Sequence, residues 1–104
     1  MRSSKYTVRL LSIAEQDISE LISYLAAEKP RAATEVLNHI ETRLQALTAH
    51  PFAGRVPHDP KLTGLGYRVL VIDNYLVFYK VKSKTVLVYR ILHGARDILR
   101  LLSE

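Results

Sequence analysis

Four side chains in the second half of the sequence combine positive charge with a titratable ring: Arg68, Arg90, His93 and Arg96. Cleavage of RNA without a metal needs a base for the 2′-hydroxyl proton, cations beside the developing phosphate charge and an acid for the leaving oxygen. Histidine and arginine can fill these roles. The structural alternative is that the arginines are solvated or ion-paired and that His93 only ends a strand.

Two tyrosines extend this candidate surface, because Tyr75 and Tyr79 share one face of a predicted strand. Their rings could contact a target, whereas the alternative is that they pack against the sheet. Other chemistries lack the residues that they need. The sequence contains no cysteine, its four histidines lack metal-ligand spacing, and Gly64 and Gly66 precede a strand rather than a helix. We therefore expect no metal and no cofactor.

An α+β domain is predicted to position these side chains. A strand over residues 6–11 leads into an amphipathic helix, where Ser12 and Glu15 match a capping box. A second helix begins near Pro30, which suits a first helical turn, and ends before His50. Its apolar residues repeat every three or four positions, so we expect a helical hairpin with a shared apolar seam.

Residues 50–66 hold three of the four prolines and three of the four glycines, which predicts a long loop. Three strands follow over residues 67–72, 75–82 and 85–92, with turns at Asp73-Asn74 and Ser83-Lys84. A short terminal helix is predicted after Asp97. Residues 1–104 thus form one domain of order β-α-α-β-β-β, in which the hairpin packs on an antiparallel sheet.

The sequence is basic, with a formal net charge of +5 and an isoelectric point near 9.7. Seven of the basic residues, against three acids, lie from Tyr67 onward, so the sheet half carries most of the excess. Such a balance favours an anionic partner. No segment approaches the roughly 18 apolar residues of a membrane span, and no signal-peptide pattern is present. We expect a cytoplasmic protein that does not bind membranes.

The element order, the segment "GLGYRVLVIDNYLVFYKV" and the ending "RILHGARD" resemble the RelE/ParE family of bacterial toxins from type II toxin–antitoxin modules. RelE-like members cut mRNA in the ribosomal A site, and Arg68 matches a position where these nucleases keep a basic residue. Two further positions of that basic set fall on Leu70 and Leu76. ParE-like members instead poison DNA gyrase, and the "RILHGARD" ending is more similar to that branch.

The resemblance implies a ParE-like toxin that binds gyrase, with Arg68, Tyr75, Tyr79, Arg90, His93 and Arg96 as target-binding candidates. The alternative that it implies is a ribosome-dependent mRNA endoribonuclease, in which Arg68, Arg90, His93 and Arg96 are catalytic. A non-toxic interaction module is a third interpretation. Either toxin implies a cognate antitoxin and a toxin–antitoxin hetero-oligomer, in which a disordered acidic segment wraps the toxin.

Overall fold

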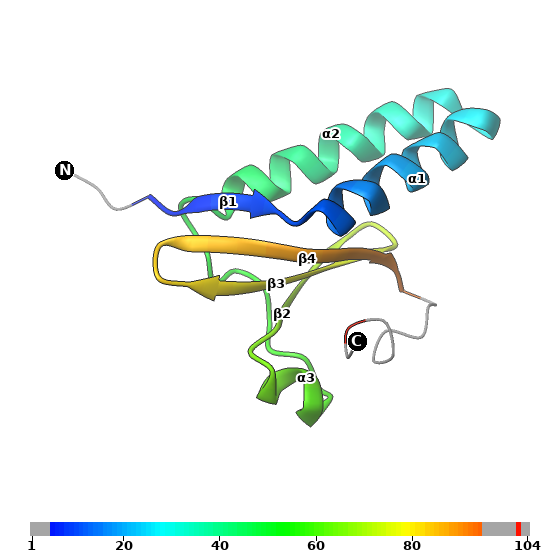
Figure 1. Ribbon diagram of the computed structural model, residues 1–104. Coiled ribbons are helices and arrows are strands. Elements are labelled where there is room, and N and C mark those ends of the chain that lie inside the picture. The colour runs from blue at the N-terminus through cyan, green and yellow to red at the C-terminus, as the bar shows by residue number, and fades with distance from the viewer. Residues whose placement is uncertain (1–4, 95–101, 103–104) are drawn as a thin grey trace.

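The computed structural model describes residues 5–94 and Leu102. The helical hairpin comprises α1 (Ser12–Glu28) and α2 (Pro30–Ala46), and a short helix, α3 (Pro60–Gly64), follows it. The strands are β1 (Thr7–Leu10), β2 (Arg68–Ile72), β3 (Tyr75–Lys82) and β4 (Thr85–His93). The hairpin covers one side of the sheet and α3 lies on the other side (Figure 1). The predicted α+β fold is confirmed.

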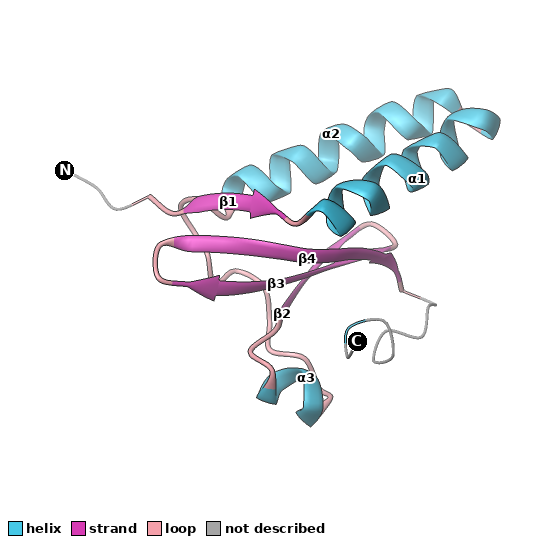
Figure 2. Ribbon diagram, viewed as in Figure 1, coloured by secondary structure: helices cyan, strands magenta, loops and turns pink. Residues whose placement is uncertain are grey.

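The sheet has the order β1-β4-β3-β2, and β1 runs parallel to β4 while the other pairs are antiparallel. The sheet is therefore mixed, and the prediction of a wholly antiparallel sheet was wrong in this respect. Because β1 and β4 are far apart in the sequence, local patterns carry no information about their pairing (Figure 2). The predicted turns are confirmed, and both contain a residue with positive φ, Asp73 at 54° and Ser83 at 56°.

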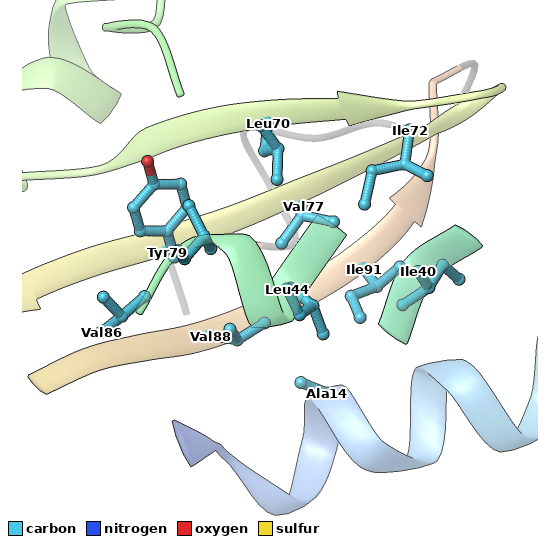
Figure 3. Packing of buried hydrophobic residues seen from close by; sticks show 11 residues of the cluster. Ala14, Ile40, Leu44, Leu70, Ile72, Val77, Tyr79, Val86, Val88 and Ile91 are labelled. Carbon is cyan, nitrogen blue, oxygen red and sulfur yellow. The ribbon is translucent and has the colours of Figure 1, made fainter. Parts of the chain in front are cut away.

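The main core lies between the hairpin and the sheet. The side chains of Val77 and Ile91 from the sheet lie beside Ile40 and Leu44 of α2, and the ring of Tyr79 belongs to the same cluster (Figure 3). Each of these residues is less than a tenth exposed. At about 25 cal/mol per Å² of apolar surface removed from water, this layer supplies the main driving force that fixes the hairpin on the sheet.

The start of α1 differs from the prediction. Leu11 is the N-cap and no side chain caps the helix, so the capping box of Ser12 and Glu15 does not form. The Leu11 amide still donates to the Val88 carbonyl of β4 at 3.0 Å, while the Leu11 carbonyl accepts from Ala14 at 2.9 Å. Pairing with the sheet therefore sets the first turn. Pro30 opens α2 as predicted.

The predicted loop at residues 50–66 contains α3, which the sequence analysis missed. Asp59 caps α3 by accepting from the Lys61 amide at 2.8 Å, and Pro60 occupies its first position. Leu62 of α3 packs with Phe78, Leu92 and Leu102 in a second apolar cluster. Apart from Leu102, the predicted terminal helix lies outside the described residues.

Candidate functional site

Arg90 is bound to the helical layer through Asp17 of α1. Its Nε donates to Asp17 Oδ2 at 2.8 Å and its Nη2 donates to Asp17 Oδ1 at 2.9 Å. The Ile91 amide donates to the same Oδ2 at 3.0 Å. The two charged side chains are only 15% and 10% exposed, so the pair is largely removed from water. This fork geometry ties β4 to α1 and engages one edge of the planar guanidinium group, through its Nε and Nη2.

The β-bulge in the β3–β4 pairing explains how Arg90 reaches the helix. The register shifts between Phe78, which pairs with Arg90, and Tyr79, which pairs with Val88. The extra residue on β4 breaks the alternation of its side chains. As a result, Arg90 and Ile91 are consecutive and yet both contact the helical side of the sheet, Arg90 at Asp17 and Ile91 in the main core.

Arg68 holds the segment that precedes β2. Its Nε donates to the Gly54 carbonyl at 3.1 Å, and its Nη2 donates to the carbonyls of Gly54 at 2.8 Å and Phe52 at 3.2 Å. The guanidinium carbon also lies 5.2 Å from the centre of the Phe52 ring. These bonds satisfy two carbonyls outside regular secondary structure, so Arg68 has a structural task in this conformation.

The two candidate tyrosines have different surroundings. Tyr79 is fully buried, and its hydroxyl accepts a hydrogen bond from the Gly54 amide at 2.9 Å. This placement favours packing over target contact for Tyr79. Tyr75 is half-buried, and its ring meets the His93 ring edge-on at a centroid distance of 5.8 Å. Tyr75 and His93 also pair directly across β3 and β4.

A pocket of about 290 Å³ opens beside this tyrosine–histidine pair. It is lined by Asp17, Tyr24, Tyr75 and His93 together with Glu20, Leu21, Ile91 and Leu92. Tyr24 is 71% exposed at its rim. The structure thus brings Arg90, His93 and Tyr75 to one end of the sheet, whereas Arg68 is bound to the 52–54 segment. Arg96 lies outside the described residues.

Two residues that the sequence analysis did not select have defined roles. Asp17 accepts the three hydrogen bonds described above. Lys80 lies on the opposite face of the sheet, with its Nζ 4.6 Å from the centre of the Tyr67 ring and 4.8 Å from that of Tyr89. No local signal marks Asp17, but the alternation of β3 does place Lys80 away from the core.

Tyr67 is buried, and its ring meets that of Tyr89 edge-on at a centroid distance of 5.3 Å. Burial, followed by the repulsion of a second negative charge at Tyr89, raises the pKa of Tyr67 above its ordinary value of 10.0. Tyr67 is therefore a neutral phenol at physiological pH. Within residues 5–94 and Leu102, no group of three or more potential metal-ligating His, Cys, Asp or Glu side chains occurs.

A family model described as the ParE toxin of the type II toxin–antitoxin system parDE matches residues 8–98. This match spans both helices of the hairpin and the whole sheet except the first residue of β1. The chain belongs to the ParE toxin family. The resemblance inferred from the sequence is thereby confirmed. No curated protein matches this ParE-family chain.

Two solved structures share the fold of this ParE-family toxin. A chain described as the chromosomal ParDE toxin–antitoxin system from P. aeruginosa aligns with a TM-score of 0.71 and 21% identity, covering 88% of this chain and 98% of that one. A chain of the RelBE2 toxin–antitoxin complex from Mycobacterium tuberculosis aligns with a TM-score of 0.60 and 22% identity, covering 91% and 98%. In the described part of the ParE-family toxin, no helix is long and apolar enough to cross a membrane.

Proposed function

We propose that this ParE-family toxin arrests growth by binding DNA gyrase and that it does not cleave RNA. The observation that carries the proposal is the structural use of both described arginines of the candidate nuclease set. Arg90 is bound to the Asp17 carboxylate, and Arg68 is bound to the carbonyls of Gly54 and Phe52. A nuclease would need such cations to be directed at a phosphate, where charge develops in the transition state.

The positions of Leu70 and Leu76 support the same proposal. Both match places where RelE-like nucleases keep a basic residue, as noted above. Leu70 is 6% exposed in the main core, and Leu76 is half-buried against the second apolar cluster. Burying a lysine or arginine at Leu70 without a partner would be costly. The core of this protein therefore disfavours the basic residue that RelE-like nucleases keep at this position.

A cognate antitoxin is part of the proposal. The two aligned structures carry titles that name toxin–antitoxin systems. In this chain an open groove of about 540 Å³ runs beside β1 and between the helices, and apolar side chains such as Leu10, Ile18 and Leu37 line it. The outer edge of β1 has no neighbouring strand among the described residues. A segment that combines an amphipathic helix with an added strand would fit there and would neutralise the toxin as a hetero-oligomer.

The test is pulse labelling of DNA and protein synthesis in the minutes after induction of this chain alone in a bacterium. We expect DNA synthesis to stop first while translation continues. Purified toxin should also inhibit supercoiling by purified gyrase. A His93→Gln variant should keep both effects, because glutamine keeps a polar side chain for target contact at this exposed position and a toxin that acts by binding needs no proton transfer there.

The alternative of a ribosome-dependent mRNA endoribonuclease rests on the exposure of His93 beside Tyr75. It predicts early arrest of translation, new mRNA ends at defined codon positions and loss of both in His93→Gln. That result would overturn the gyrase proposal. Unchanged growth and unchanged supercoiling activity would instead indicate a non-toxic interaction module.

A further inference from the structure

The pocket of about 290 Å³ beside Tyr75 and His93 lies where α1 meets the start of β3 and the end of β4. The helical hairpin extends beyond this end of the sheet (Figure 1). The volume is at the lower limit of the roughly 300–1,000 Å³ typical of small-molecule sites, so it suits a single long side chain. The lining combines aromatic rings with carboxylates, and among the described residues it contains no lysine or arginine.

Glu20 gives this pocket its negative charge. The other acid in the lining, Asp17, is paired with Arg90, so its charge is compensated. Glu20 Oε2 accepts a hydrogen bond from Gln16 Nε2 at 3.0 Å, and Glu20 has no ion-pair partner among residues 5–94 and Leu102. A carboxylate offers about four acceptor positions, so the exposed Glu20 can accept further hydrogen bonds from a cation.

Two tyrosines supply the aromatic part of the lining. Tyr75 is half-buried, and its edge-on contact with the His93 ring holds it in place. Tyr24 is 71% exposed at the rim, about one turn of α1 beyond Glu20. Cations are attracted to the faces of tyrosine rings, and arginine makes such contacts more often than lysine. The pocket therefore offers a carboxylate and an aromatic ring on neighbouring turns of one helix.

We propose that this pocket binds an arginine side chain presented by a segment of a partner protein. Glu20 would accept hydrogen bonds from the guanidinium group, and the Tyr24 ring would stack on its planar face. A guanidinium can do both at once, because it is flat and carries its N–H donors at its edges, whereas the compact ammonium of lysine cannot. Tyrosine and arginine are also enriched among the residues that dominate binding at protein interfaces.

The exposure of Tyr24 and the charge of α1 favour a protein segment over a free small cation. A small cation in the pocket would leave most of the Tyr24 ring in water, whereas the residues that flank an arginine would cover it. Although the whole chain is basic, α1 carries four acids and no basic residue. This helix therefore attracts a basic segment to the pocket.

The test uses the full chain, isotopically labelled by cell-free synthesis, and the peptide leucyl-arginyl-leucine blocked at both ends. Binding is followed by NMR, through the amide signals of the residues that line the pocket. Citrulline has the shape of arginine without its charge, so the citrulline peptide should bind at least about fivefold more weakly. The lysine peptide should bind about two- to threefold more weakly, because it loses the stacking on Tyr24.

Variants of the two proposed contacts locate the site. Glu20→Gln should weaken binding of the arginine peptide about three- to fivefold. Tyr24→Ser should have a similar effect, whereas Tyr24→Phe keeps the ring face and should stay within about twofold of the unmodified chain. The matched control is Glu35→Gln, which removes the same charge from an exposed position on α2 and should change the affinity less than about twofold. Circular dichroism melting checks that each variant is folded.

Four results would overturn the proposal. The first two are no change in the signals of the pocket with the arginine peptide and equal binding of the citrulline peptide. The third is equal losses in Glu20→Gln and Glu35→Gln, which would indicate a general effect of net charge. The fourth is binding of ethylguanidinium as tight as that of the peptide, which would indicate a site for a small free cation. The proposal goes beyond gyrase binding and does not depend on it, because these measurements contain no gyrase.

Discussion

Arg90 of β4 and Asp17 of α1 lie 73 residues apart in the sequence and form a two-fold hydrogen bond between a guanidinium and a carboxylate. Asp17 Oδ2 also accepts from the Ile91 amide, so one carboxylate satisfies both a charge and a backbone donor of the bulged strand. Arg90, which the sequence analysis considered as a catalytic candidate, is therefore part of the contact between α1 and the sheet.

Asp17→Asn should destabilise the protein by about 2–4 kcal/mol, because it removes the negative charge that accepts two hydrogen bonds from the largely buried Arg90 guanidinium. Urea denaturation followed by circular dichroism measures the change. Glu20→Gln is the control, since Glu20 is exposed on the same helix and should change the free energy of unfolding by less than about 0.5 kcal/mol. Equal effects of the two variants would show that the Asp17–Arg90 pair adds no stability.

Gly54→Ala should lower the stability by about 1–3 kcal/mol through overpacking. A Cβ at Gly54 would lie 2.7 Å from both the Tyr79 hydroxyl and the Val69 carbonyl oxygen, so the buried ring or the β2 backbone must move. Gly64→Ala is the matched control, because a Cβ there meets nothing within 4 Å. Thermal melting should show a clear loss for Gly54→Ala and little change or a slight gain for Gly64→Ala.

Tyr79→Phe should cost about 1–3 kcal/mol, because the buried Gly54 amide then lacks its acceptor. The measurement is the free energy of unfolding from urea titrations. Tyr24→Phe removes a hydroxyl from a ring that is 71% exposed and should have almost no effect. A Tyr79→Phe protein as stable as the unmodified chain would show that another acceptor or water replaces the hydroxyl.

The raised pKa of Tyr67 predicts a loss of stability in alkaline solution. A folded-state pKa above 10.0 means that the folded chain holds this proton more tightly than the unfolded chain does. The associated stability is fully present below pH 10 and is lost as the pH rises through the folded-state pKa. Tyr67→Phe removes this contribution, so its unfolding free energy should fall less steeply above pH 10. Parallel curves for the two proteins would contradict the prediction.

The sequence by itself determined the hairpin, the three consecutive strands and the family. Helical spacing of Ala33, Ile40 and Leu44 predicts the buried face of α2, and these residues are buried in the structure. The turns at Asp73 and Ser83 are also local, because a two-residue connection fixes which strands are neighbours. Local patterns suffice where the stabilising contacts lie close together in the sequence.

Only the tertiary structure decided the pairing of β1 with β4, the start of α1 and the tasks of the two arginines. Leu11 became the N-cap because its amide bonds to Val88, and Arg90 reached Asp17 because a bulge turned it toward α1. These outcomes depend on residues many positions apart. A sequence shows which side chains carry charge, but only the packed fold shows which of them form ion pairs. Arg90 pairs with Asp17 in this structure, whereas Lys80 has no acidic partner among the described residues.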